Sequence, residues 1–301
     1  MQTDATETVP TYPFISRFGL LFFCLIGGIA IGQLLVEVLL HLCNQPGTIE
    51  QIKRVQLGEK DSVFWVILLQ VFNQIAGFAA AACLVYFYTD DKFFSFKRVK
   101  LKYWFFLPVL ILLSFFVCEW ISFTPETFSF PDFLKSWEYY FESVEAENEA
   151  LLLRLLPADA GYELAFRFLV FAIIPAICEE LFFRGALLGI LSKFFSLHWA
   201  VWISAFIFSL FHFQAFGFFA RWLMGGVLGY FRIYSGSLFL SIFAHLLFNA
   251  GGLLFFYLIP SFPNSILEMM PFWMSGGIMV MFILSTFLYL KSLKINHPNE
   301  S

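Results

Sequence analysis

Long apolar stretches alternate with short polar segments along most of this 301-residue chain. An apolar run of about 20 residues can cross the hydrocarbon core of a bilayer as an α-helix. By this measure the pattern predicts eight membrane-spanning helices, at about residues 17–42, 63–88, 103–123, 162–190, 198–215, 219–233, 237–258 and 271–291. The expected fold class is therefore all-α, a polytopic membrane helical bundle of about eight transmembrane helices.

The composition agrees with this fold class. Hydrophobic residues make up 60% of the chain and charged residues only 13%, whereas soluble domains carry about 25% charged residues. The net charge of -4, spread over the polar segments, gives no sign of a nucleic-acid partner. The five cysteines stand singly in or beside apolar runs, without a CxxC or His/Cys cluster. We therefore expect neither disulfides nor a structural zinc site.

Basic residues in the polar segments predict the orientation, because cytoplasmic loops of membrane proteins carry an excess of lysine and arginine. Residues 89–102 hold the strongest cluster, with five basic side chains. Residues 43–62 argue weakly for the opposite orientation, since their basic residues are interleaved with acids. With eight spans, the stronger cluster puts both termini in the cytoplasm. Such a protein has the lipid bilayer as a partner. We expect it to be an integral protein of a bacterial inner membrane.

The polar segment at residues 124–160 cannot cross a bilayer, because five glutamates fall between positions 138 and 149. Aromatic and leucine side chains interleave with these acids, which predicts an amphipathic helix lying in the outer membrane interface. We divide the chain into a polar N-terminal segment, N-terminal transmembrane helices with the acidic interfacial segment, a second helical core, and the last transmembrane helix with its tail. The boundaries are 1–16, 17–158, 159–258 and 259–301.

Two adjacent carboxylates and an arginine stand inside the fourth predicted span: Glu179, Glu180 and Arg184. A charge at the centre of a membrane helix costs about 2.5–3.5 kcal/mol on insertion, so such residues usually face the bundle interior and carry function. Glu180 and Arg184 are four residues apart with the acid first, the order that favours an intrahelical pair. Glu179 lies about 100° around the helix from Glu180 and has no such partner. It is left as a candidate general base.

Three further polar residues stand in the later spans. His212 lies near the end of the fifth, and His245 and Asn249 lie four residues apart on one face of the seventh. At 1.5 Å per residue, counting from the predicted turns puts Glu180 and His212 at similar depth and His245 about 10 Å shallower. A break in the fourth span at Gly185 would close this gap.

Together these residues form three ordered motifs: EExxxR at 179–184, FxxxH at 208–212 and HxxxN at 245–249. In order and spacing they resemble the motifs of the CPBP (Abi) family, which includes type II CAAX prenyl proteases and bacteriocin-processing or immunity proteins. The resemblance covers about residues 160–258. It implies an intramembrane endopeptidase whose cavity opens toward the cytoplasm and whose substrate is a membrane-associated protein or peptide. The catalytic residues that it implies are Glu179, Glu180, Arg184, His212, His245 and Asn249.

The same resemblance implies that Glu179 activates a water, and it leaves two schemes for the other residues. In one, Glu179, His212 and His245 bind Zn²⁺ in a three-ligand site with an open position. In the other, the histidines and Asn249 stabilise the oxyanion and the enzyme is metal-independent. We favour the second scheme, because a zinc-bound Glu179 would leave no clear spare base.

Two other function classes stay open as alternatives. A proton- or metal-coupled membrane transporter also carries intramembrane acids and histidines, and a non-catalytic bacteriocin-immunity-type membrane protein would share the fold. Transporters often contain two related halves with matching interruptions. Here the polar residues fall within 179–249, and the first half carries only Glu37 and Glu119, each near a helix end. That asymmetry favours an enzyme.

Overall fold

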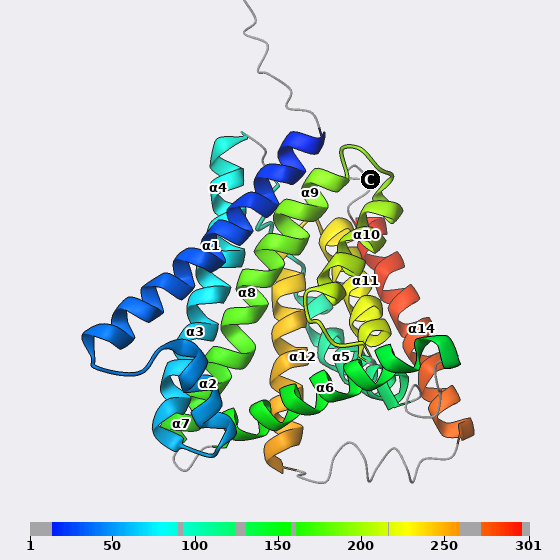
Figure 1. Cartoon of the computed structure of the whole chain (residues 1–301). Helices are drawn as coiled ribbons and strands as arrows, with labels where there is room; N and C mark the ends of the chain where they lie inside the picture. Colours follow the sequence, from blue (N-terminus) through cyan, green and yellow to red (C-terminus); the bar gives the residue numbers. More distant parts are fainter. Residues whose placement is uncertain are drawn as a thin grey trace, which may run out of the picture.

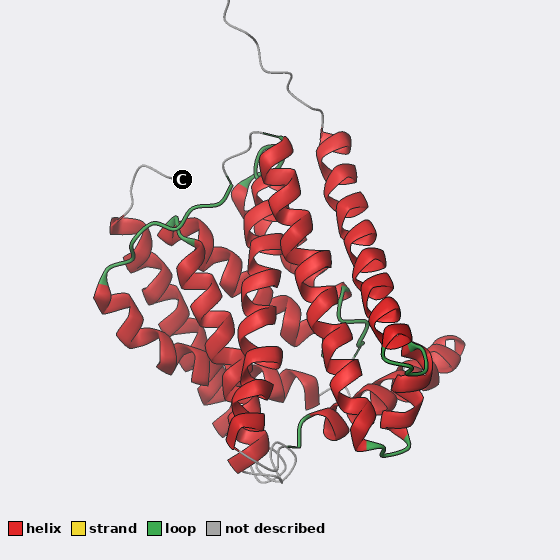
Figure 2. Ribbon diagram, turned by 90° about the vertical axis from the view of Figure 1, so that its left-hand side faces the viewer, coloured by secondary structure: helices red, strands yellow, loops and turns green. Residues whose placement is uncertain are grey.

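The protein is described by a computed structural model over residues 14–89, 93–123, 131–157, 161–215, 217–258 and 272–296. Within these ranges it is built of helices, and the sole β-type pairing is an isolated antiparallel bridge between Phe96 and Ser237. Figures 1 and 2 show most of the long helices packed side by side as a bundle. The prediction of an all-α membrane helical bundle is confirmed.

Each of the eight predicted spans corresponds to one helix or to a run of consecutive helical segments. The first three are α1, the run η1–α3–η2–α4, and α5, at Phe14–Leu42, Lys60–Ser62, Val63–Phe72, Asn73–Ala79, Ala80–Tyr88 and Leu101–Phe123. The fourth is the run α7–η5–α8–η6–α9, at Gly161–Phe168, Leu169–Ile173, Ile174–Glu180, Leu181–Leu187 and Leu188–Leu191. The last four are α10, α11, α12 and α14, at Leu197–Leu210, Phe218–Ser235, Leu238–Leu258 and Phe272–Asn296.

Five of the described helical segments are long and apolar enough to cross a membrane: Phe14–Leu42, Lys60–Tyr88, Leu101–Ile121, Leu238–Leu258 and Met274–Leu293. The other predicted spans differ from these for plain reasons. The fourth carries several charged residues, α11 carries two arginines, and α10 has only 14 residues. The predicted end of the fifth span at residue 215 is wrong, because α10 ends at Leu210 and Phe213 turns the chain with a positive φ of 53°.

The fourth run forms the centre of the bundle, and Figure 1 shows α8 between α3 and α12. Phe182, Phe183 and Leu187 are at most 1% exposed, whereas Phe23 of α1 is 76% exposed on the outer surface. Two segments of this run, η5 and η6, are π-helical, a geometry that is frequent at functional sites. The Ser204 hydroxyl of α10 donates a hydrogen bond of 2.9 Å to the Phe183 carbonyl within η6. The helix thus continues through Gly185 instead of breaking there.

The connection that precedes α5 folds into the bundle instead of lying over its surface. Phe93 is only 6% exposed, and a Cβ atom at Gly189 would lie 2.5 Å from the Phe93 Cβ. The Ser95 hydroxyl donates to the Gly236 carbonyl at 2.6 Å, and the Leu238 amide donates to the Ser95 carbonyl at 2.8 Å. These contacts cover the turn between α11 and α12, which is therefore buried.

Helix α6 (Lys135–Leu155) follows η4 (Asp132–Leu134) and crosses one end of the bundle, while α1 begins and α14 ends at the opposite end (Figure 1). It contacts α2 (Thr48–Gln56) and α3. Leu155 is 7% exposed and Tyr139 is 66% exposed, as expected for an amphipathic helix. Parts of the sequence predictions, at residues 1–13, 90–92, 124–130, 158–160, 259–271 and 297–301, lie outside the described residues.

Two glycines of α1 allow η2 to approach closely. A Cβ atom at Gly28 would lie 2.0 Å from the Ala76 carbonyl oxygen, and one at Gly32 would lie 3.2 Å from the Phe72 carbonyl oxygen. Small residues at such contacts let the backbones of membrane helices meet. This contact sets the position of η2, which carries Gln74 toward the centre of the bundle.

We predict that Gly28→Ala lowers the free energy of unfolding by about 1–3 kcal/mol, the usual cost of overpacking, because the added methyl meets a backbone oxygen. Gly27→Ala is the matched control, since a Cβ atom there has nothing within 4 Å. Equilibrium unfolding in mixed micelles measures both variants. Equal stability of the two would contradict the close packing of α1 on η2.

Candidate active site

The predicted pair of Glu180 and Arg184 is present at the centre of the bundle. Arg184 Nη1 donates to Glu180 Oε1 at 2.6 Å, and the two residues are 2% and 0% exposed. Arg184 Nη2 also donates to the Gly225 carbonyl of α11 at 3.2 Å, and the guanidinium lies 4.4 Å from the centroid of the Phe208 ring of α10. A single arginine therefore ties η6 to α10 and α11.

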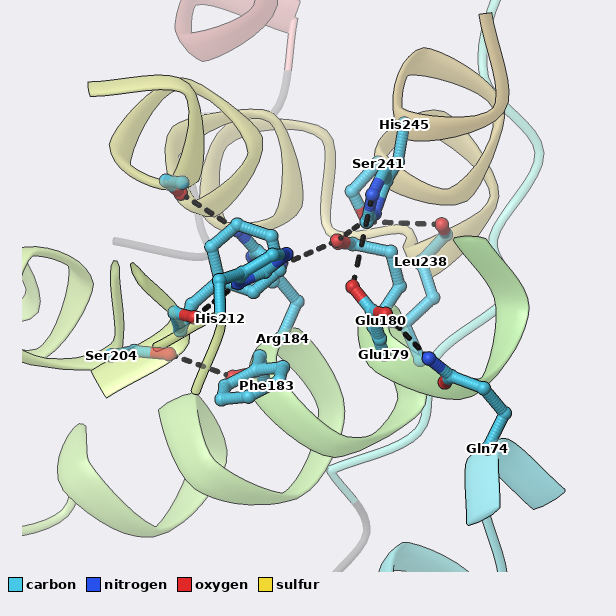
Figure 3. A network of polar contacts seen from close by, with 12 residues as sticks. Gln74, Glu179, Glu180, Phe183, Arg184, Ser204, His212, Leu238, Ser241 and His245 are labelled. Atoms are coloured by element: carbon cyan, nitrogen blue, oxygen red, sulfur yellow. Dashed lines mark hydrogen bonds and ion pairs between the residues drawn. The ribbon is translucent and has the colours of Figure 1, made fainter. Parts of the chain in front are cut away.

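His245 of α12 joins this pair. Its Nδ1 lies 3.0 Å from Glu180 Oε1, and its Nε2 lies 3.9 Å from Glu179 Oε2. Because a carboxylate oxygen accepts, Nδ1 is the donor, and Nε2 is directed toward Glu179 (Figure 3). The Phe208 ring packs edge-on against the imidazole at a centroid distance of 5.8 Å. Glu180 is thus shared between Arg184 and His245, which fixes the orientation of the imidazole.

The expectation that His245 lies about 10 Å shallower than Glu180 is wrong. The count of residues assumed that the turn before α12 lies at the same level as the turn before α10. That turn is instead buried, with Ser235 and Ser237 each 0% exposed beneath the connection that contains Ser95. The nine-residue path along α12 therefore begins deeper in the bundle and reaches the level of the acids.

The sequence predicted that Glu179 has no partner within its own helix, but a residue of another helical segment binds it. Gln74 Nε2 of η2 donates to Glu179 Oε1 at 2.9 Å, and the two residues are 6% and 8% exposed. Figure 3 shows Gln74 on one side of Glu179 and His245 on the other. Sequence reasoning missed Gln74, although the adjacent amides Asn73 and Gln74 inside an apolar span were a signal. Glu179 thus has one carboxylate oxygen held and the other facing His245.

His212 and Asn249 lie near this centre with looser contacts. His212 stands in the turn after α10, where its Nδ1 lies 3.0 Å from the Phe208 carbonyl oxygen. It is close enough to Glu179 and His245 to interact with both electrostatically. Asn249 lies one turn beyond His245 on α12, is half-buried, and makes no side-chain hydrogen bond to any described residue. The carbonyl oxygen and the NH2 group of the Asn249 side chain are therefore open to a ligand.

The predicted zinc ligands do not form a metal site in this arrangement. In the part of the chain that the structure describes, no group of three or more His, Cys, Asp or Glu side chains has the spacing to hold a metal ion. Glu179 and His245 face one another, but the contacts of His212 do not bring it in as a third ligand. In this arrangement the three predicted ligands do not have the spacing of a three-ligand zinc site.

Residues 161–251 match a family model, that of the type II CAAX prenyl endopeptidase Rce1-like proteins. The predicted family resemblance is confirmed over these residues. The matched stretch, called the Rce1-like region below, contains all six predicted catalytic residues. No curated protein and no protein of solved structure shows significant similarity to the chain.

The Rce1-like region is similar to CAAX-protease-like membrane endopeptidases, which supports such an activity at the level of the family. Such an enzyme takes a peptide or protein as its substrate, and the apolar helices imply contact with lipid. Gln74 and the whole of η2 lie outside the Rce1-like region. The first half of the chain therefore contributes a residue to the site that the family motifs do not include.

Proposed function

We propose that the protein hydrolyses peptide bonds within the membrane, with Glu179 as the general base that activates a water. The observation that carries this proposal is the 3.9 Å separation between Glu179 Oε2 and His245 Nε2. A water placed beside these atoms can hydrogen-bond to both, because two hydrogen bonds of ordinary length span that separation. The hydrogen bond from Gln74 to Oε1 directs Oε2 toward this water.

The charges of the site support a role in proton transfer. When both acids are ionised, the two carboxylates and the Arg184 guanidinium together carry one net negative charge. Taking a proton from water neutralises Glu179 and transfers the negative charge to the hydroxide that attacks the substrate. Glu180 is less suited to be the base, because Arg184 and His245 bind its Oε1 and its Oε2 is buried in a residue that is 0% exposed. The two adjacent carboxylates thus have different roles, one structural and one chemical.

The remaining polar groups suit the stabilisation of the oxyanion. The hydroxide formed from the water attacks the carbonyl carbon, and negative charge develops on the carbonyl oxygen. Asn249 has no hydrogen-bond partner among the described residues, so it can offer a side-chain N–H to this oxygen. His212 and His245 can each offer an imidazole N–H when the ring nitrogen that faces the oxygen is protonated. When the tetrahedral intermediate collapses, the C–N bond breaks and Glu179 passes its proton to the leaving amine, which leaves the new carboxyl group on the other product. No step of this scheme passes through a metal.

We further propose that the substrate is a membrane-associated protein or peptide and that both termini are cytoplasmic, in a bacterial inner membrane. The basic connection before α5 and Lys193 after α9 lie at the end of the bundle where α1 begins, and the acid-rich α6 crosses the other end. Excess lysine and arginine favours the cytoplasmic side. The transporter and immunity alternatives gain no supporting observation from these contacts.

We predict that Glu179→Gln lowers kcat by about 10²–10⁴-fold, the usual contribution of a general base, while the protein still folds. Gln keeps the size of the side chain and removes only the basic oxygen. The assay is cleavage of a peptide library by the protein reconstituted in liposomes. The matched control is Glu149→Gln, which alters an exposed acid of α6 and should change nothing.

A second variant tests the positioning of the base. Gln74→Leu removes the hydrogen bond to Glu179 Oε1 and should lower kcat with little change in KM. Gln70→Leu, at an exposed position of α3, should leave both constants unchanged.

For the first of these two predictions, full activity of the Glu179→Gln variant would overturn the proposed chemistry.

We also predict that Asn249→Ala lowers kcat by about 10²–10³-fold with little change in substrate binding, as the loss of one oxyanion donor does. Chelators should have no effect on the native enzyme. The same cleavage assay measures kcat and the effect of chelators, and metal analysis of the purified protein measures its zinc content. Stoichiometric zinc that disappears together with activity in both His212→Ala and His245→Ala would replace this scheme with the metal scheme and leave the peptidase activity standing.

A further inference from the structure

Five of the six candidate catalytic residues lie within helical segments, whereas His212 lies in a turn. Helix α10 ends at Leu210 and α11 begins at Phe218, so His212 belongs to the α10–α11 turn, of which residues 211–215 and 217 are described. A group carried by a helix is held more precisely than one carried by a loop. The position of His212 therefore depends on the contacts that hold this turn.

The backbone directly after His212 adopts an uncommon conformation. Phe213 has a φ of 53°, in the left-handed region that bulky residues rarely occupy. Such a residue keeps this conformation only where the surrounding structure imposes it. The Phe213 side chain is 77% exposed, so the packing of its ring does not impose it. The constraint therefore comes from a neighbouring part of the turn.

Arg221, in the first turn of α11, supplies such a constraint. Its Nη1 donates to Gln214 Oε1 at 2.9 Å, and its Nη2 donates to the Gln214 backbone carbonyl at 2.6 Å. The planar guanidinium presents its N–H groups in a rigid fork, so the two bonds fix the side chain and the backbone of Gln214 together. Gln214 directly follows Phe213. This Arg221–Gln214 clamp therefore acts on the residue next to the left-handed conformation.

Separate contacts fix the ends of the turn. The Ser209 hydroxyl donates to the Phe218 carbonyl at 2.7 Å, which joins the last turn of α10 to the first residue of α11. A Cβ atom at Gly217 would lie 2.3 Å from Arg221 Nη1, so glycine at this position leaves room for the guanidinium. The clamp thus holds the middle of a turn whose ends are already anchored.

Arg221 lies close to His212 and acts on it through the turn. The two side chains interact electrostatically, but His212 contacts the Phe208 carbonyl, whereas the hydrogen bonds of the Arg221 side chain go to Gln214. Glu145 of α6 is also close enough to Arg221 to interact with it electrostatically. Arg221 belongs to none of the three sequence motifs, and α6 lies outside the Rce1-like region.

We infer that Arg221 is a positioning residue, which holds His212 beside Glu179 and His245 by clamping the α10–α11 turn at Gln214. This inference rests on the proposed function, in which His212 helps to stabilise the oxyanion. Without the clamp, Phe213 can leave the left-handed region. Because both ends of the turn are anchored, the other residues of the turn must compensate for that change, and His212 is one of them.

The test is a double-mutant cycle of Arg221→Gln and His212→Ala, with kcat measured by cleavage of a peptide library in liposomes. Arg221→Gln alone should lower kcat about 10- to 100-fold with little change in KM, because a displacement of about 1 Å near the chemistry can cost about 10²-fold. In the His212→Ala background it should change kcat little further, since no imidazole remains to be misplaced. An equal loss in both backgrounds would overturn the inference.

Arg221→Lys separates the clamp from the charge. Lysine keeps the positive charge but cannot form the two-pronged contact, so this variant should lose activity as Arg221→Gln does. Full activity of Arg221→Lys would attribute the effect to charge and overturn the clamp. If Arg221→Gln does not fold, Gln214→Ala decides. It removes one of the two bonds and should lower kcat less strongly, and an unchanged kcat would overturn the inference.

Arg232→Gln is the matched control. Arg232 is also an arginine of α11, and it donates to the Phe93 backbone carbonyl at 2.9 Å, in a connection that does not carry His212. Its substitution should leave kcat unchanged. If Arg232→Gln lowered kcat as much as Arg221→Gln, the effect would be one of α11 packing in general, and the inference would be wrong.

A readout without substrate separates this inference from the proposed function. In protein with ¹⁵N-labelled histidine, the imidazole NMR signal of His212 is the one that His212→Ala removes. Arg221→Gln should shift or broaden this signal and leave that of His198 unchanged, since His198 lies at the start of α10 and contacts Tyr230. An unchanged His212 signal would overturn the inference whether or not peptides are cleaved. Absence of cleavage by the native protein would overturn the proposed function alone.

Discussion

The buried ion pair between Glu180 and Arg184 organises the centre of this bundle. Removing two charges from water costs several kcal/mol for each ion, and their attraction compensates only when the geometry is good and the remaining polar atoms are bonded. Here Arg184 Nη1 and Glu180 Oε1 are 2.6 Å apart. The Gly225 carbonyl accepts a second hydrogen bond from the guanidinium, and the Phe208 ring covers the guanidinium. The pair is thus stable only when η6, α10 and α11 are packed together.

The same pair determines what the neighbouring groups can do. Because Glu180 also accepts a hydrogen bond from His245, the imidazole is fixed with its other nitrogen toward Glu179. Gln74 holds the opposite oxygen of Glu179 from the N-terminal half of the chain. Two adjacent carboxylates in one helix thereby acquire different environments. This difference is the physical basis for proposing Glu179, and not Glu180, as the base.

The parts of the site that the sequence predicted depend on local geometry. Glu180 and Arg184 pair because residues four apart share one face of a helix, and this spacing is visible in the chain. Gln74 was not predicted, since it is 105 residues from Glu179 and only the packing of η2 on α8 brings them together. The depth of His245 was predicted wrongly because no sequence pattern indicates that the turn at Ser235 is covered by another connection. Helix positions followed from hydropathy, whereas long-range contacts did not.

A double-mutant cycle on Glu180 and Arg184 tests the central claim most directly. Equilibrium unfolding in mixed micelles would compare the native protein with Glu180→Gln, Arg184→Met and the double variant. Each single substitution should cost about 3–5 kcal/mol of stability, because it leaves a buried charge without its partner. The double variant should be no less stable than either single variant, since neither charge then remains. Additive losses in the double variant would contradict the account, because they would mean that the two side chains stabilise the bundle independently of one another.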